Sequence, residues 1–170
     1  MIRKLETMEL HKLRRELKQN SDPQTRESGQ RFFKEEVRLY GVKTATAHRI
    51  SKSHFQHIKD KTKTEIFDLC EELWKSGILE ETFVACNWSY YIRELYEPGD
   101  FKIFEKWVGN YVTNWASCDT LCNHTIGTFL DMHLPFCPAQ KQIFDAAFTF
   151  DYESDYNKSR DIGDPRSYDE

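Results

Sequence analysis

The chain has 170 residues, of which 39% are hydrophobic and 31% charged, and its formal net charge is −4. This length suits one domain, no apolar run approaches the roughly 18 residues of a membrane span, and the five cysteines do not form a small disulfide scaffold. The charged N-terminus is unlike a secretory signal, so we expect a reduced, cytoplasmic protein.

Charge is divided unevenly along the chain. Residues 1–144 hold 21 basic and 20 acidic side chains, whereas residues 145–170 hold 3 basic and 8 acidic side chains. Only the first part is therefore a candidate for binding a polyanion, and its basic side chains would have to gather on one face.

Apolar residues recur at helical spacing, and no strand pair is evident. A first, strongly charged helix is marked by Leu5, Met8, Leu13 and Leu17. A second is predicted to begin at Pro23, behind the N-cap residue Asp22, and to run to Tyr40 before Gly41 ends it. Thr44 is predicted to cap the third.

Four further helices are predicted before residue 133. One begins at Thr62 or Thr64 and stops at Gly77, and Asp100 is predicted to cap another. The other two are LEETFVACNWSYYIREL (79–95) and NWASCDTLCNHTIGTFLDMH (114–133). Short connections favour antiparallel helix pairs, so we predict an all-α fold, a HEAT-like helical-repeat solenoid.

The pattern changes near residue 133. Residues 1–133 are predicted to form the repeat domain, and residues 134–150 one further short helix. Residues 151–170 hold seven acidic side chains and almost no aliphatic ones, and such a segment buries too little to offset its lost conformational entropy. We expect this acidic tail to be disordered.

Trp115 and Asp119 form the most suggestive pair for chemistry. They are four residues apart on a predicted helix, so they differ by about 40° around its axis and lie one turn apart on the same side. A carboxylate and an aromatic face both stabilise developing positive charge. The alternative is that Asp119 is a surface cap or ion-pair residue and Trp115 belongs to the core.

Cys118, Cys122 and His124, with Cys137 downstream, supply the ligand types of a zinc site. His124 follows Cys122 by only two residues and is expected to point elsewhere, and both helical cysteines suit a buried apolar face. We therefore expect no metal and no cofactor.

Basic side chains cluster in the middle of the chain: Lys43, His48, Arg49, Lys52, Lys59, Lys61 and Lys63. A helix that begins at Thr44 beside Lys43 is suited to holding a phosphate. The alternative is that the cluster is a solvated face.

Three segments together resemble the DNA alkylation repair glycosylases with HEAT-like repeats. They are RFFKEEVRLYGVKTATAHRISK (31–52), EELWKSGILEETFVAC (71–86) and, above all, NWASCDTLCNHTIGTFL (114–130). Their order and separation follow the family over about three quarters of the chain.

The resemblance implies a solenoid of helix pairs whose concave, basic face holds duplex DNA, so that residues 1–133 form a DNA-binding domain. It also implies hydrolysis of the N-glycosidic bond of N3- and N7-alkylated purines by a monomer without a metal. Asp119 takes the position of the catalytic aspartate, and Trp115 that of an aromatic residue that contacts the deoxyribose. Lys43 and Thr44 fall on a loop near the lesion, and Phe32 falls where the family usually has a tyrosine in the cleft.

Members of this family normally continue with further helix pairs, which carry another cleft tryptophan and arginines that grip the DNA backbone. Residues after 133 contain no Trp, and Arg160 and Arg166 lie in the acidic segment. We therefore expect a chain that lacks the family's C-terminal half. The alternative to an enzyme is a truncated, non-catalytic helical-repeat module that binds DNA or protein.

Overall fold

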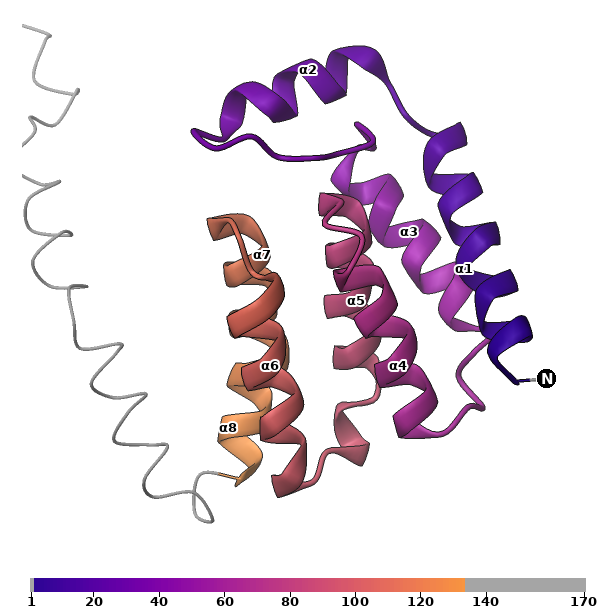
Figure 1. Ribbon diagram of the computed structural model, residues 1–170, viewed down its shortest axis with the longest axis vertical. Coiled ribbons are helices and arrows are strands. Elements are labelled where there is room, and N and C mark those ends of the chain that lie inside the picture. The colour runs from indigo at the N-terminus through magenta and orange to yellow at the C-terminus, as the bar shows by residue number, and fades with distance from the viewer. Residues whose placement is uncertain (1, 134–170) are drawn as a thin grey trace, which may run out of the picture. The chain divides into compact units, whose positions relative to one another are not determined.

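A computed structural model of the protein describes residues 2–133 (Figure 1). This part of the chain is all-α, as predicted: it contains no strand, and its one β-bridge is isolated, between Arg38 and Ile78. None of its helices is both long and apolar enough to cross a membrane. The predicted helix in residues 134–150 and the predicted acidic tail, residues 151–170, lie outside the described residues.

The α-helices follow one another with short connections. They are α1 (Ile2–Gln19), α2 (Pro23–Phe32), α3 (Thr44–Phe55), α4 (Lys63–Trp74), α5 (Leu79–Tyr91), α6 (Phe101–Tyr111), α7 (Trp115–Thr120) and α8 (Gly127–His133). Two 3₁₀ turns, η1 (Arg93–Leu95) and η2 (Pro98–Asp100), join α5 to α6, and a π-helical turn, η3 (Leu121–Ile126), joins α7 to α8.

The helices pack in two layers. Helix α4 packs against α1, α5 and α6, whereas α5 packs against α3, α7 and η3. Thus α1, α4 and α6 form one layer and α3, α5 and α7 form the other, with α2 crossing one end of both (Figure 1). Helices α3, α5 and α7 run side by side in the same direction. Each helix of this layer is antiparallel to the helices of the other layer (Figure 1), and such stacking of antiparallel pairs is compatible with a helical repeat.

Large aromatic side chains fill the space between the layers. Trp74, Trp88, Trp107, Phe104 and Phe129 are all fully buried. The indole Nε1 of Trp88 donates a hydrogen bond to the carbonyl oxygen of Ser51, 3.0 Å away, so the core also ties α5 to α3. Leu13 and Leu17 are buried as expected, but Met8 is exposed, so the inward face of α1 is narrower than its apolar pattern suggests.

Several predicted helix starts are confirmed. The Asp22 side chain accepts a hydrogen bond from the backbone N–H of Thr25, with Pro23 in the first turn. Thr62, rather than Thr64, caps α4 in a reciprocal capping box with Glu65. These side chains satisfy backbone N–H groups that the helix itself leaves without partners.

Of the two other predicted caps, that of Thr44 is wrong and that of Asp100 is confirmed in position only. Thr44 is the first residue of α3 rather than its cap, because Lys43 holds the cap position without a side-chain hydrogen bond. Asp100 holds the N-cap position of α6, but its carboxylate makes no capping hydrogen bond there and instead accepts hydrogen bonds from the backbone N–H of Glu97 and from the Lys63 ammonium group.

The predicted extent of the second helix is also wrong. Helix α2 ends at Phe32, and the chain then continues in an extended path to Lys43. Val37 and Leu39 are buried while Arg38 between them is exposed, which is the alternation of an extended segment. The carbonyl of Arg38 accepts a hydrogen bond from the backbone N–H of Leu79, so tertiary contacts hold this segment against the start of α5.

Candidate functional site

An exposed group of aromatic rings lies where the end of α2 meets the start of α7. The ring centres of Phe32 and Trp115 are 5.3 Å apart, and Phe33 lies 5.6 Å from Trp115. Phe32 is 69% exposed and Trp115 47% exposed. The fold thus brings together two site residues predicted from distant segments, and Trp115 is not a core residue. We call Phe32, Phe33 and Trp115 the aromatic cluster.

Asp119 lies one turn after Trp115 on α7 and is exposed. Within residues 2–133 its carboxylate accepts no hydrogen bond and pairs with no basic side chain. It is therefore not the surface ion pair that the sequence left open. A solvent-facing carboxylate beside an exposed indole can attract a cationic group.

The loop that leads into α3 is held by a buried carboxylate, that of Glu80. Its Oε2 accepts a hydrogen bond from the backbone N–H of Tyr40 at 2.9 Å. Its Oε1 accepts hydrogen bonds from the N–H groups of Gly41 at 2.8 Å and Val42 at 2.9 Å. Only 3% of Glu80 is exposed. The backbone just before Lys43 is therefore fixed by three charge-assisted hydrogen bonds.

Glu81 continues this network on the other side of the loop. It accepts a hydrogen bond from the Tyr40 hydroxyl at 2.5 Å and one from the Arg14 guanidinium at 2.9 Å. Burial, with the neighbouring Glu81 carboxylate, raises the pKa of Tyr40 well above its usual range, so the phenol stays protonated and donates. The network joins α1, the loop and α5.

The sequence analysis did not assign a role to Glu80 and Glu81. Acidic residues in the first turn of a helix are common, because they interact favourably with its dipole. Their partners lie about forty residues earlier in the chain or, for Arg14, 67 residues earlier, which leaves no local signal.

Lys43 and Thr44 are exposed at the start of α3. They line a hollow of about 350 Å³ together with residues of α2 and α5, among them Gly29 and Phe83. The start of α7 lies at this same end of the layer (Figure 1). Because α3, α5 and α7 are parallel, their N-terminal ends lie along one edge, and each contributes positive potential there.

The predicted basic cluster divides into two parts. His48, Arg49 and Lys52 are exposed on α3. By contrast, Lys61 and Lys63 at the start of α4 are paired with acidic neighbours, Lys63 with Asp100 at 2.9 Å. The exposed side chains of His48, Arg49 and Lys52 are therefore the part of the cluster that is available to a polyanion.

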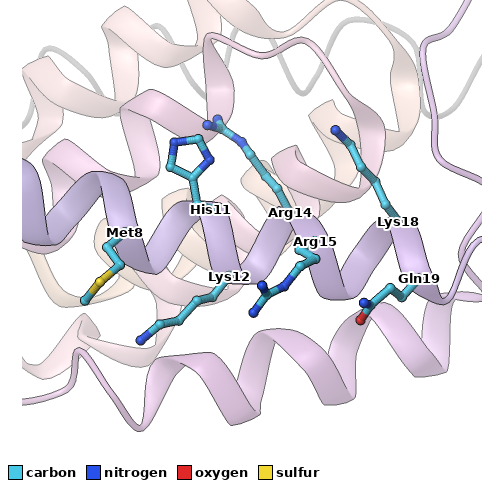
Figure 2. Close-up of a pocket in the computed structure, with 7 residues that line it drawn as sticks. All are labelled: Met8, His11, Lys12, Arg14, Arg15, Lys18 and Gln19. Carbon is cyan, nitrogen blue, oxygen red and sulfur yellow. The ribbon is translucent and has the colours of Figure 1, made fainter.

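Helix α1 carries a second set of basic side chains in its C-terminal half, shown in Figure 2: His11, Lys12, Arg14, Arg15 and Lys18. Two of them are committed to acidic partners, because Lys12 pairs with Glu9 at 2.8 Å and Arg14 with Glu81. The positive charge of α1 is thus partly neutralised within the protein.

The four potential zinc ligands do not converge in the described residues. The Sγ atoms of Cys118 and Cys122 are 3.9 Å apart, but His124 packs against the ring of Tyr90. Cys137 lies outside the described residues. No group of three or more His, Cys, Asp or Glu residues suited to a metal ion is found within them.

The fold and the site define an all-α protein of paired helices with an exposed aromatic and acidic site at one end of a helix layer. The family model described as DNA alkylation repair enzyme matches residues 13–146, most of the chain. The chain therefore belongs to the DNA alkylation repair enzyme family, which supports a role in DNA repair with DNA as substrate. No curated protein and no solved structure matches the chain significantly.

Proposed function

We propose that this protein is a DNA glycosylase that hydrolyses the N-glycosidic bond of N3- and N7-alkylated purines in duplex DNA. The observation that supports it most directly is the exposed face of α7. There an exposed Asp119, with no ion-pair partner among residues 2–133, follows one turn after an exposed Trp115 whose ring packs against Phe32. We expect the protein to act as a monomer without a metal.

The chemistry matches a single carboxylate. A purine alkylated at N3 or N7 carries positive charge and leaves as a neutral base, so its departure needs little acid assistance. Positive charge then develops on the sugar, where the Asp119 carboxylate would stabilise it and orient the attacking water. The face of Trp115 would contact the same deoxyribose and attract the same charge.

Lys43 and Thr44 would approach the DNA beside the lesion, at the edge where the N-terminal ends of α3, α5 and α7 lie. Lys43 and the exposed basic residues of α3 would contact phosphates, and these contacts would make binding depend on salt concentration. The Glu80 network would keep the loop in place before DNA arrives, which reduces the ordering cost of binding.

Release of 7-methylguanine from methylated duplex DNA tests the proposal. Asp119→Asn keeps the shape of the side chain but removes its charge, and we expect release to fall about 100-fold or more. DNA affinity should change little. Asp131→Asn is the matched control, because Asp131 is also exposed and lies further along the same run of helix, on α8; its release should equal that of the unmodified chain.

Equal release by Asp119→Asn and the unmodified chain would remove the catalytic assignment. Binding of methylated duplex without any release by the unmodified chain would instead support the second candidate, a non-catalytic DNA-binding module. The observation that favours that candidate is the aromatic cluster itself, since exposed rings bind ligands without requiring Asp119.

A further inference from the structure

Two cysteines of α7 and η3 lie next to the proposed catalytic aspartate. The Sγ atoms of Cys118 and Cys122 are 3.9 Å apart, and both side chains are partly exposed. Cys70 and Cys86 are fully buried, and burial raises the pKa of each thiol well above its usual range. Among the described cysteines, therefore, only Cys118 and Cys122 form an accessible pair.

The spacing of this pair does not suit a disulfide. The Cβ atoms of residues i and i+4 in a helix are about 5–6 Å apart, whereas a disulfide needs about 3.5–4.5 Å. The two sulfurs would also have to approach from 3.9 Å to about 2.05 Å. Closing the bond would therefore distort the helix that carries Asp119.

The same spacing suits one atom bonded to both sulfurs. Two bonds of about 2.3 Å, the length of a zinc–thiolate bond, drawn to sulfurs 3.9 Å apart enclose an angle of about 116°. This angle lies between the tetrahedral and trigonal values, so a three-coordinate bridging centre would fit with little movement of the sulfurs, whereas a linear two-coordinate centre would not. No third protein ligand joins them within residues 2–133, so these residues alone do not form a structural zinc site, which takes four ligands.

We propose that Cys118 and Cys122 form a two-thiolate site for a single soft, thiophilic, three-coordinate centre that takes two ligands from the protein and the third from elsewhere, as a trivalent organoarsenical does with its own carbon and Cu⁺ does with an added thiol. With phenylarsine oxide, two As–S bonds form and the As=O bond breaks. The two thiol protons and the oxygen leave as water, and arsenic stays trivalent. With Cu⁺, two Cu–S bonds form and two protons are released.

Capture of such a centre would also regulate the proposed site, a step that rests on the proposed function. Asp119 lies close enough to Cys122 for the two to interact electrostatically, so a centre on the two sulfurs, with the third group that it carries, would crowd the approach of the sugar to Asp119. We expect base release to fall when the site is filled, and to recover when a small dithiol removes the centre.

The test measures binding separately from activity. Intact-protein mass spectrometry with phenylarsine oxide, in excess monothiol, should show one adduct per chain that a dithiol reverses. Cys118→Ser and Cys122→Ser should each weaken the adduct roughly 100-fold or more, because a chelating pair becomes a single ligand. Cys137→Ser is the control and should bind like the unmodified chain. Thermal unfolding by circular dichroism checks that each variant is folded.

A parallel titration with Cu⁺ against a competing chelator shows whether the site accepts the organoarsenical, Cu⁺ or both. Binding of either probe that both serine variants lose supports the site and identifies the centre it accepts. Unchanged binding in a folded Cys118→Ser, loss in Cys137→Ser, or no binding of either probe overturns it. If the unmodified chain releases no methylated base but forms the reversible adduct, the proposed function fails while the site stands.

Discussion

Glu80 offers the sharpest test of how the candidate site is held. Removing its carboxylate with Glu80→Ala leaves three backbone N–H groups without their acceptor, those of Tyr40, Gly41 and Val42. A hydrogen bond to a charged group contributes about 1.5–3 kcal/mol, and an unsatisfied buried donor costs about 1–3 kcal/mol. The three share one partner and are not additive, so we expect Glu80→Ala to lower the free energy of unfolding by about 3–5 kcal/mol.

Glu80→Gln separates charge from shape. Its oxygen can still accept from Gly41 and Val42, but its amide nitrogen is a donor that faces the N–H of Tyr40. We expect a loss of about 1.5–3 kcal/mol, which at an m-value of about 2 kcal/mol/M lowers the urea midpoint by roughly 1 M. Equilibrium urea unfolding followed by circular dichroism measures both variants.

The matched control is Glu72→Gln. Glu72 is exposed on α4 and pairs with Lys75 at 2.7 Å, so its removal should cost less than about 1 kcal/mol. A loss below about 1 kcal/mol for Glu80→Ala, or equal losses for Glu80→Gln and Glu72→Gln, would refute the view that this carboxylate holds the loop.

Three further outcomes follow from the described contacts. Gly41→Ala should lower the free energy of unfolding by about 2–4 kcal/mol in the same assay, because Gly41 has a φ of 88° and an added Cβ would lie 2.5 Å from a side-chain atom of α2. Its control is Gly109→Ala, which adds a Cβ in open space on α6 and should be neutral or stabilising. Phe32→Ala and Trp115→Ala should leave stability within about 1 kcal/mol, since both rings are exposed, yet weaken binding of methylated duplex about tenfold in fluorescence anisotropy; unchanged affinity would exclude the aromatic cluster from DNA contact. A hydrogen bond from the Thr25 side chain holds the pKa of Asp22 below its usual 3.8. The stabilising effect of the Asp22 carboxylate is therefore fully present above that value and is lost as the pH falls through the lower folded-state pKa. Asp22→Asn retains a capping side chain but no titrating group, so its urea midpoint should fall less between neutral pH and pH 3.

Local chemistry decides which parts of this fold can be predicted from the sequence. The starts of α2 and α4 depend on residues adjacent in the chain, a cap followed by proline and a capping box, and both were predicted. The end of α2 depends on Leu79 and Glu80, which bind the following segment from about forty residues away. The apolar pattern of residues 33–40, which follow α2, is too short to distinguish a helix from an extended segment.

The candidate site shows the same division. Four residues of spacing place Asp119 one turn from Trp115, and the resemblance adds Phe32, which the structure places 5.3 Å from Trp115. Neither the spacing nor the resemblance predicts the Glu80 and Glu81 carboxylates that hold the loop. Neither predicts the π-helical turn η3, because a wide turn depends on packing against the rest of the protein rather than on any one residue type.

That wide turn places one extra residue between Asp119 and the buried end of the helix. At its end the N–H of Gly127 reaches back five residues to the carbonyl of Cys122, so η3 accommodates one residue more than a regular α-helix would over the same length. Phe129 is anchored in the core beyond it. Deleting a single residue from η3 would let this stretch rewind as a regular α-helix while α7 and α8 keep their register, so the fold should accept one codon lost here, whereas a residue lost from α8 ahead of Phe129 would turn that ring about 100° around the axis and out of the core.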